Sequence, residues 1–588
     1  MKKLIAVLLA VFLLAGCGNN TVAEVTTVQT TAPVVEEPAD ILSPVEEIPY
    51  VSRFDSRTRI LLSDDGITVD GGEETESVYT SRDIVYYEDR AVYESGNPYG
   101  EGGDADKHTA EEAAGHLVVN ITAPGAYEIE GKLSAGQIRV DLGEMAYDDP
   151  EAVVELILCN AEITCTVAPA ILFLNTYECD GNWSVEDAKA EVDTSDAGAN
   201  LILDGENKVN GAYVAKIYKD KEGEKKLWKQ DGAIYSYMSL NVFGPGSLDL
   251  RAENEGLDTE LHLTIHGGDI AIRSGNDGIN TNEDGVSVTT INGGTLRILA
   301  GLGAEGDGID SNGYLVINGG TVISSAHPAA DAGLDSDLGS YVNGGTVVAL
   351  GSTMDWAESE SGQVTMNLQF AGYRTGAITV AREDGGELFG FDPSADPVLK
   401  DSARQFMGAV LSCPTFEKGE TYTVFVDGKQ MQYTGTDVGF GFGGMGFGGN
   451  MGGMLPPEGF DGEMPEMPQN FQPGQMPQGG FQGEMPEGMT FPEGGFPGFG
   501  GQMPEGFDGE IPEGFDGKMP ENFEGKRPEN FGEQMPEGFG GERPEEFNGQ
   551  MPEGFQGRGE RNPQGEASTG FYMQDMVNAF SGVTEVTE

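Results

Sequence analysis

The stretch DGINTNEDGVSVTTINGGTLRIL, residues 277–299, contains the two phrases from which the fold of this chain can be predicted. Its second half recurs three more times, and the matching glycines are 26, 26 and 25 residues apart: Gly267, Gly293, Gly319 and Gly344. Its first half recurs as EGLDT from Glu255, DGIDS from Asp307 and AGLDS from Ala332. A fixed period with two phrases per repeat is typical of stacked coils that bury their apolar faces against one another.

The composition of each repeat favours strands. The period is too short for two full helices with their turns. Val, Ile and Thr alternate with polar residues, and Gly-Gly and Asn-Gly pairs punctuate them, which indicates short strands joined by tight turns. We therefore predict an all-β fold, a parallel β-helix, with less regular strand-like segments before residue 240. The less regular strands after Leu350 are expected to cap its open end.

The chain is strongly acidic. Its 588 residues include 98 Asp and Glu against 33 Lys and Arg, for a formal net charge of −65. Such a field repels nucleic acid and anionic lipid surfaces. It suits divalent cations, basic partners or neutral sugars.

The first residues predict export. Lys2 and Lys3 precede a short apolar run and the sequence LAGC, residues 14–17. The run is too short to span a membrane, and LAGC resembles a bacterial lipobox. We expect residues 1–17 to be a lipoprotein signal and Cys17 to carry the lipid. That lipid alone would hold the protein on the outer face of the bacterial cell membrane. An ordinary secretory signal with a chance cysteine is the alternative. Residues 18–53 are expected to form a flexible spacer.

The end of the chain changes composition abruptly to Gly, Met, Pro, Phe and Glu. An octad repeats from Phe507 to Phe555, with a proline three residues before each phenylalanine. Proline and glycine in every unit oppose helix and sheet alike, so residues 436–588 are predicted to be a disordered low-complexity tail. The tail is either an inert spacer or a multivalent contact surface for an unknown partner. A short amphipathic helix is expected near Phe571 to Phe580.

Acidic residues of the first phrase would align if the repeats stack in register. Neighbouring strands lie about 4.8 Å apart. Asp258, Asn280, Asp310 and Asp335 would form one column. Glu255, Asp277 and Asp307 would form the next, which Ala332 interrupts beside Asp331. Ionised carboxylates at that spacing repel one another unless a cation separates them, water screens them or one is protonated. Ca²⁺ accepts carboxylate, amide and carbonyl oxygens in irregular geometry.

The sequence therefore predicts structural calcium in these turns. No His or Cys shares the phrases, which argues against zinc or copper. The alternative is that the Asp and Asn side chains only cap their own turns. The disulfide state of Cys159, Cys165, Cys179 and Cys413 stays open, although Cys159 and Cys165 lie in apolar, core-like sequence.

Residues 211–239 differ from their surroundings because lysines alternate there with aromatic residues. One interpretation is a solvated loop whose lysines offset nearby carboxylates. The other is a projecting loop that offers cations and ring faces to an acidic sugar. The candidate carbohydrate-binding residues are Lys225, Lys226, Trp228, Tyr235 and Tyr237.

Enzymatic patterns are weak. A uronate lyase pairs calcium with a basic side chain that removes a proton, and the regular repeats offer only Arg251, Arg273 and Arg297. These arginines are expected to be surface charges. Candidate acids for an inverting glycosidase are too numerous to single out a pair. No catalytic residue is therefore predicted.

Five segments in order resemble the clostridial carbohydrate-binding β-helix family: ITAPGAYEIEGKL, ELILCNAEIT, GAIYSYMSLNVFGPGSLDL, DGINTNED and DGIDSNGYLVINGGTV. The resemblance covers roughly Phe54 to Tyr433. It implies a right-handed β-helix, similar in fold to polysaccharide lyases, that binds calcium and plant-wall polysaccharides such as cellulose and pectic acid without established catalysis. It places calcium ligands at Asp277, Asn280, Asp307, Asp310, Asp331 and Asp335. Ala332, where the family has Asp, puts the last site in doubt.

The sequence as a whole predicts a cell-surface lipoprotein. Its β-helix, residues 54–435, would bind calcium and an acidic or cellulosic polysaccharide. Two alternatives stay open. One is a calcium-dependent polysaccharide lyase with an arginine base, and the other is a structural adhesin that acts through its repeat tail.

Overall fold

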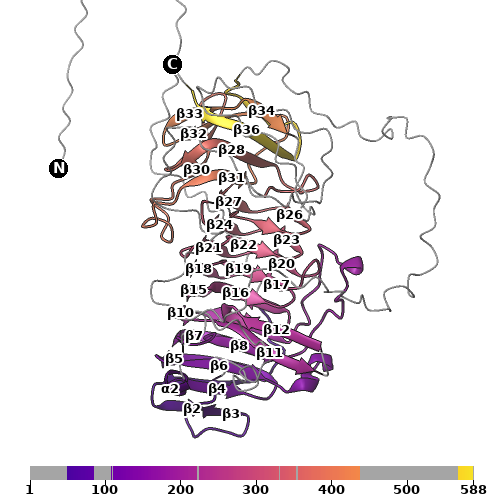
Figure 1. Ribbon diagram of the computed structural model, residues 1–588, viewed down its shortest axis with the longest axis vertical. Coiled ribbons are helices and arrows are strands. Elements are labelled where there is room, and N and C mark those ends of the chain that lie inside the picture. The colour runs from indigo at the N-terminus through magenta and orange to yellow at the C-terminus, as the bar shows by residue number, and fades with distance from the viewer. Residues whose placement is uncertain are drawn as a thin grey trace, which may run out of the picture. The chain divides into compact units, whose positions relative to one another are not determined.

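Strands make up nearly all the regular structure of the computed structural model, as the sequence predicts (Figure 1). The structure describes residues 50–84, 108, 110–221, 224–329, 331–352, 355–437 and 567–586. The predicted lipoprotein signal with Cys17, most of the predicted spacer and the octad repeats lie outside the described residues, as does a separate unit, residues 449–554. None of the helices in the described part of the chain has the length and apolarity needed to cross a membrane.

Three columns of parallel strands form the larger part of the structure, in which each strand pairs with its counterpart in the next repeat. The first column is β1 (Arg57–Ser63), β5 (Gly125–Leu133), β7 (Val154–Thr164), β9 (Ala199–Asp204), β14 (Leu240–Phe243), β17 (Leu263–Ile265), β20 (Val288–Ile291), β23 (Tyr314–Ile317) and β26 (Gly339–Val342).

The second column begins at the C-terminal half of β7 and is visible as a stack in Figure 1. It continues through β10 (Glu206–Gly211), β15 (Ser247–Ala252), β18 (Asp269–Ser274), β21 (Thr295–Leu299), β24 (Thr321–Ser325) and β27 (Thr346–Gly351).

The third column carries the acidic phrases. It consists of β4 (Leu117–Ile121), β6 (Gly136–Asp141), β8 (Ile171–Asn175), β13 (Gly232–Ser236), β16 (Glu255–Thr259), β19 (Ile279–Thr281), β22 (Ile309–Ser311) and β25 (Asp335–Ser336).

We call these three columns the stacked region. Alternate residues of each strand point to one shared apolar interior, because side chains alternate across a strand. Leu263 of the first column, Ile272 of the second and Ile279 of the third belong to the same buried cluster. The repeated apolar positions are thus the core of the stacked region.

The repeated Gly-Gly pairs make the turn between the first and second columns. The second glycine of each pair has a positive φ, between 80° and 100°, at Gly268, Gly294, Gly320 and Gly345. A Cβ on Gly294 would also lie 2.7 Å from the carbonyl oxygen of Gly268. Both the backbone conformation and the close approach of successive turns therefore require glycine.

Beside these glycines the repeat places asparagines that bond to one another. Asn318 Nδ2 donates to Asn292 Oδ1 at 2.9 Å, and Asn343 Nδ2 donates to Asn318 Oδ1 at 3.0 Å. In the preceding repeats the column continues as His266, whose ring stacks on Phe243 with 4.4 Å between centroids. This column ties successive repeats together at one corner.

Few elements interrupt the columns. β2 (Gly66–Val69) pairs antiparallel with β1, and β3 (Val78–Ser81) pairs antiparallel with β4. β11 (Val214–Lys221) and β12 (Glu224–Gln230) form a separate antiparallel hairpin. The described helical segments are α2 (Ala110–Ala114) and the 3-10 turns η1 (Glu144–Asp148) and η2 (Val185–Asp187).

Mostly antiparallel strands follow the last repeat, and we call them the closing unit. They are β28 (Thr365–Arg374), β29 (Ile378–Arg382), β30 (Glu387–Phe391), β31 (Phe406–Ser412), β32 (Thr421–Val426), β33 (Lys429–Gln432), β34 (Gly435–Asp437), β35 (Phe571–Tyr572) and β36 (Val577–Glu585). The antiparallel pairing of β31 with β27 ends the second column, so the last repeat does not leave an open edge there.

The predicted helix near Phe571 to Phe580 is wrong, because this segment contains β35 and most of β36. β36 pairs with β28 on one side and with β33 and β34 on the other (Figure 1, yellow). Phe571 and Phe580 are buried in the core of the closing unit. Val577, Phe580 and Val583 are spaced as in a helix, but pairing on both sides of β36 outweighs this local preference. Residues 567–586 thus pack with the strands of residues 364–437.

The closing unit also covers the outward face of the last repeats. Leu299, Ile323 and Val348 point away from the central core, and they pack instead with the apolar cluster of the closing unit. Arg404 Nη1 donates to the carbonyl oxygen of Gly301 at 3.3 Å. Outward-pointing apolar residues of the second column therefore occur where the closing unit covers that column.

Candidate functional site

The acidic phrases stack in the register that the sequence predicts. Asp258 pairs with Asn280, Asn280 with Asp310, and Asp310 with Asp335. Their strand neighbours, such as Ile279, belong to the central core, so these polar side chains lie on the opposite face of the third column. Oxygen-bearing side chains of four successive repeats therefore form one column.

A second acidic column runs along the turns just before these strands, and its carboxylates bond to the backbone of a neighbouring repeat. Asp277 Oδ1 accepts from the Asp307 N–H at 2.7 Å, and Asp307 Oδ1 accepts from the Ala332 N–H at 2.5 Å. Asp331 Oδ2 accepts from the Gly306 N–H at 3.0 Å. One oxygen of each carboxylate thus bonds to a neighbouring repeat and not to its own turn.

Burial and crowding oppose the ionisation of these carboxyls. Burial, followed by the nearby Asp335 carboxyl, raises the pKa of Asp307 to about 9 and that of Asp310 to about 7. Burial, with Glu255 and Asp310 as further causes, raises the pKa of Asp277 as well. An ordinary aspartate has a pKa near 4. Without a nearby cation, Asp277 and Asp307 would therefore hold protons at neutral pH, and Asp310 would be partly protonated.

The N-terminal end of the first acidic column has buried oxygens without a hydrogen-bond partner among the described residues. Asp258 is fully buried, and burial together with Glu255 raises its pKa well above the usual range. Asn282 Nδ2 donates to its Oδ1 at 2.6 Å. Within the described residues, Asp258 Oδ2 and Asn280 Oδ1 have no hydrogen-bond partner. Such atoms are costly unless a proton or a cation satisfies them.

Asp355 is a member of this cluster that the sequence analysis missed. Its Oδ2 accepts from the Ser336 N–H at 3.1 Å. Burial, followed by contact with the Asp335 carboxyl, raises its pKa. Asp355 lies beyond the last repeat, in a stretch that carries neither phrase, so the periodicity gave no signal for it. It supplies a carboxylate near the repeat where Ala332 stands in place of an acid.

The donor set near these columns consists of oxygen atoms, but it is not a preformed cage. Across the part of the chain that the structure describes, no three His, Cys, Asp or Glu side chains converge as a metal site. Asp258, Asp277, Asn280, Asp307, Asp310, Asp331 and Asp335 are thus brought together as neighbours in successive repeats. A bound ion would need amide, carbonyl or water oxygens in addition to their carboxylates.

The predicted Lys-aromatic loop is divided between two environments. Lys225, Lys226 and Trp228 lie on β12, opposite Asp220, Lys219 and Ile217 of β11. Tyr235 and Tyr237 lie on and just after β13, and both rings are buried. The Tyr235 hydroxyl donates to Glu260. The prediction that these two tyrosines offer ring faces to a sugar is therefore wrong, because strand pairing on both sides of β13 places them under neighbouring residues.

Between β8 and β9 the chain makes a long excursion, residues 176–198, whose only regular element is η2. Glu178 fixes its start: Oε2 accepts from the Ser239 N–H at 2.7 Å and Oε1 from the Ser239 hydroxyl at 2.9 Å. Thr194 fixes its end by donating to Asn241 Oδ1 at 2.7 Å. Long ordered loops of this kind are uncommon and are often binding loops.

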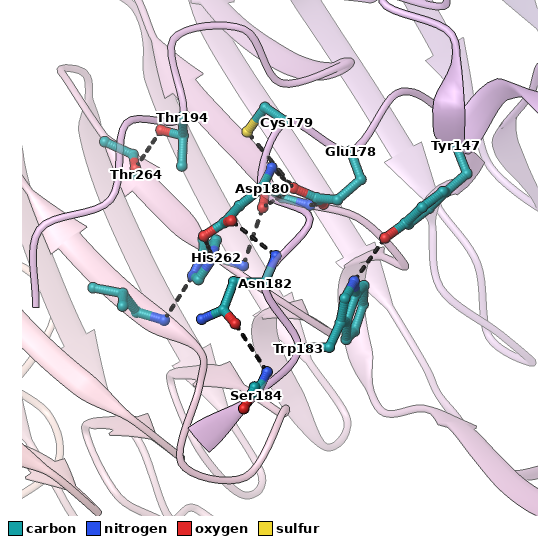
Figure 2. Close-up of polar contacts among 12 residues, drawn as sticks. Tyr147, Glu178, Cys179, Asp180, Asn182, Trp183, Ser184, Thr194, His262 and Thr264 are labelled. Carbon is teal, nitrogen blue, oxygen red and sulfur yellow. Dashed lines mark hydrogen bonds and ion pairs between the residues drawn. The ribbon is translucent and has the colours of Figure 1, made fainter. Parts of the chain in front are cut away.

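The excursion carries a polar hollow on one side, and Figure 2 shows Asp180, Asn182 and His262 of its lining. The hollow has a volume of about 580 Å³, and its lining includes Asp180, Asn182, Lys189, Glu191 and His262. His262 Nδ1 accepts from the Val288 N–H at 3.0 Å, so Nε2 carries the ring proton and faces Asp180 Oδ2 at 3.3 Å. This hydrogen bond lowers the pKa of Asp180. The histidine and its aspartate are thus held in one orientation.

The same excursion exposes an aromatic ring. The Trp183 side chain follows Asn182 and points toward Tyr147, and its Nε1 donates to the Tyr147 hydroxyl at 2.6 Å (Figure 2). Trp183 remains 38% exposed. The sequence analysis passed over this segment because it belongs to no repeat; the signal available was a tryptophan in a polar stretch between two apolar strands.

The remaining chemical groups offer little reactivity. Cys159, Cys165, Cys179 and Cys413 are all free thiols. Burial raises the pKa of Cys179, and the Glu178 and Asp180 carboxylates add to the effect. Arg251 and Arg273 pair with Asp249, at 3.5 and 3.0 Å, and Arg297 pairs with Asp269 at 2.9 Å. Arg251 is exposed, as the sequence predicts, but the prediction of a surface charge is wrong for Arg297, whose side chain is 13% exposed and also pairs with the buried Asp396 at 3.2 Å.

Comparison with known proteins agrees with the resemblance stated from the sequence. A family model described as "Carbohydrate-binding domain-containing protein" matches residues 116–369. A carbohydrate-binding domain-containing protein of Acetivibrio thermocellus is 29% identical over 176 residues, which are 29% of this chain and 51% of that protein. The chain thus matches about half the length of this curated relative.

Among solved structures, the polysaccharide lyase-like protein from C. thermocellum, solved as a gadolinium derivative, is 20% identical. The alignment covers 49% of this chain and 93% of that protein, with a TM-score of 0.29. The resemblance predicted from the sequence is confirmed by the family model and the curated relative: over residues 116–369 this chain is similar to the carbohydrate-binding domain-containing proteins.

Proposed function

We propose that this chain is an exported lipoprotein that binds polysaccharide through a right-handed parallel β-helix containing structural calcium. The observation that carries the proposal is the position of the family match. Residues 116–369 run from the start of β4 into β28 and include the acidic phrases of the third column. The part of the chain that resembles carbohydrate-binding proteins is therefore the part that carries the stacked carboxylates.

The β-helix itself is supported by the three columns around one core. Each regular repeat contributes a strand to every column, and glycine pairs turn the chain between the first and the second. A chain that visits three columns in order, repeat after repeat, describes a coil. The right hand comes from the family resemblance.

Calcium is supported by the chemistry of the two acidic columns. The nearby donors are carboxylate and amide oxygens, and Asp258 Oδ2 and Asn280 Oδ1 have no hydrogen-bond partner among the described residues. Asp277, Asp307, Asp310 and Asp335 would hold the ions, together with backbone carbonyls and water, because Ca²⁺ accepts such mixed oxygen sets. The ions would neutralise carboxylates that otherwise repel across successive repeats, and so stabilise the stack.

Binding without catalysis is the form of the proposal that the geometry favours. A lyase needs a base free to take a proton, but each of the three arginines of the regular repeats pairs with a carboxylate. The runner-up, a calcium-dependent lyase, predicts new absorbance of unsaturated uronate when the protein is incubated with polygalacturonate and calcium. The absence of that absorbance, together with retention on the same polymer, would favour binding.

The test of the proposed function is retention on polysaccharide. The purified full chain is run through native gels containing polygalacturonate, xylan or hydroxyethylcellulose, and is mixed with insoluble cellulose, each with calcium and with chelator. We expect retardation or co-sedimentation with at least one glycan in calcium, and a weaker effect in chelator. Unchanged mobility in every gel and no co-sedimentation would overturn the proposed function.

Lipid anchoring is proposed from the lipobox-like sequence and has its own test. Wild-type protein should fractionate with membranes and incorporate labelled palmitate, whereas Cys17→Ala should do neither. A wild-type protein that is released into the medium without label would contradict the anchor. It would leave the carbohydrate-binding proposal intact.

A further inference from the structure

We propose that the excursion between β8 and β9 is the glycan-contacting surface, and that it selects neutral sugar chains over polyuronates. The polar hollow beside Asp180 and His262 would receive a sugar ring, and the exposed Trp183 indole would contact the chain next to it. This inference rests on the proposed function and deepens it, because it names the site and the class of glycan.

The excursion is held in place before any ligand arrives. Glu178 anchors its start to Ser239, Thr194 anchors its end to Asn241, and Asp180 bonds to the buried His262. Within it, Asn182 Oδ1 accepts from the Ser184 N–H at 3.0 Å. A surface fixed by its own contacts loses little conformational freedom on binding, and so more of the contact energy appears as affinity.

The size and composition of the hollow suit a polar ligand. Its volume of about 580 Å³ lies within the range of small-molecule sites. Asp187 and Glu191 contribute exposed carboxylates to its lining. Carboxylates accept strong hydrogen bonds from hydroxyl groups, and a neutral sugar is rich in hydroxyl donors.

The charge of the hollow selects against acidic glycans. Asp180, Asp187, Glu191 and Asp193 contribute to its lining, and Lys189 is the one lysine or arginine there. A uronate ring would bring a further negative charge next to several carboxylates, which costs free energy unless a cation accompanies it. The pocket therefore favours the neutral member of the two glycan classes, such as a β-linked glucan or xylan.

Trp183 supplies the apolar contact that a sugar ring needs. Sugar rings carry C–H groups on their faces, and an indole buries them at low entropic cost because it has only two side-chain torsions. Its N–H is already bonded to Tyr147 Oη, which fixes the orientation of the ring. Asn182 lines the hollow and Trp183 is the next residue. A glycan several rings long exceeds the spacing of adjacent residues, and so it can contact both.

The experiment is titration calorimetry of the full chain with cellohexaose, xylohexaose and hexagalacturonate, in calcium. We expect binding of a neutral hexasaccharide, a loss of at least tenfold in Trp183→Ala, and partial recovery in Trp183→Phe. The matched control is Tyr373→Ala, which removes a 48% exposed aromatic ring in the closing unit and should change affinity less than twofold. Equal melting temperatures would show that the variants fold.

A second variant tests the charge argument. Asp187→Asn with Glu191→Gln keeps oxygen acceptors but removes two negative charges, so binding of hexagalacturonate should appear or strengthen. Unchanged neutral-sugar affinity in Trp183→Ala, or wild-type binding of hexagalacturonate alone, would overturn this inference and leave the proposed function standing. A hollow that binds a divalent cation but no sugar would also overturn this inference. No binding of any glycan would overturn both proposals.

Discussion

The stacked region and the closing unit are both built of strands, but their strands find partners in different ways. In the stacked region each strand pairs with its counterpart in the next repeat, as Asn280 does with Asp310. In the closing unit Thr365 pairs with Val577, across a long stretch of intervening sequence. The first kind of contact is written in the sequence as a repeat. The second joins two unique segments and leaves no periodic trace.

The repeats also determine where side chains of like charge lie close together. The stacked region places like-charged side chains above one another, because repetition of a phrase repeats its aspartates. Opposite charges pair in both regions, as Arg297 does with Asp269 at 2.9 Å in the stacked region and Lys418 with Asp575 at 3.2 Å in the closing unit. Repetition thus brings carboxylates together in successive repeats of the stacked region.

The largest expected effect comes from removing the strand that has no counterpart in the repeats. Deletion of residues 568–588 takes away β35 and β36, with the buried Phe571, Phe580 and Val583. Each such side chain contributes about 1.5–3 kcal/mol, a large share of the roughly 5–15 kcal/mol that a domain has. We expect loss of a cooperative unfolding transition for the closing unit, measured by urea denaturation.

The matched control deletes residues 440–564 and retains β36. It should unfold at nearly the same urea concentration as the intact chain, because both paired ends of that segment stay present. Equal stability of the 568–588 deletion and the intact chain would contradict the role assigned to β36.

The next largest expected effect is the pH dependence of the unfolding stability of the stacked region in the absence of metal. The folded-state pKa of Asp307 is about 9 and that of Asp310 about 7, above the unfolded value near 4. The stabilisation linked to these raised pKa values is therefore complete below about pH 4 and is lost as pH rises through the folded values. In chelator, the melting temperature should rise by several degrees between pH 9 and pH 6.

Sodium chloride at high concentration screens the general surface charge, so the pH series is run in it. Asp307→Asn keeps an acceptor for the Ala332 N–H and removes the titrating group, and it should flatten the slope. An unchanged slope in this variant would assign the effect to the net charge of the chain.

A smaller effect is expected when a glycine of the stacked region and a glycine of the closing unit are each replaced by alanine. A Cβ on Gly308, in the stacked region, would lie 1.8 Å from Ser324 Oγ and 2.4 Å from the Gly333 carbonyl oxygen. Overpacking of this kind costs about 1–3 kcal/mol, so Gly308→Ala should lower the unfolding midpoint. Gly372→Ala, in β28, meets nothing within 4 Å and should lie within about 0.5 kcal/mol of wild type. Similar losses in both variants would show that glycine matters for chain flexibility rather than for the approach of neighbouring repeats.

The smallest effect is expected at the asparagine column. Asn318→Ala removes its bonds to Asn292 and Asn343 and should cost about 1 kcal/mol, as judged by the same urea series. A much larger loss would mean that the column acts cooperatively rather than bond by bond.

The features that could be predicted from the sequence are those that recur with the repeat. The glycine turns and the register of Asp258 with Asn280 follow from phrases that recur, because a repeat must stack on its copy. Asp355, Trp183 and β36 occur once each, and their partners are set by tertiary packing that no local pattern encodes. The prediction for Tyr235 was wrong for a related reason. An aromatic residue among lysines suggests an exposed ring, but β13 is a strand of the third column that is paired on both sides.

Thermal unfolding of the full chain in calcium, in magnesium and in chelator is the direct test of structural calcium in the stacked region. A ligand that binds only the folded state raises its stability, by about 2.7 kcal/mol at a hundred times its Kd. We predict a calcium-specific rise in melting temperature. The rise should be lost in the double variant Asp307→Asn with Asp310→Asn, and it should persist in the exposed control Asp401→Asn. Identical melting curves in calcium and chelator would contradict it and would leave the stacked carboxylates as protonated turn caps.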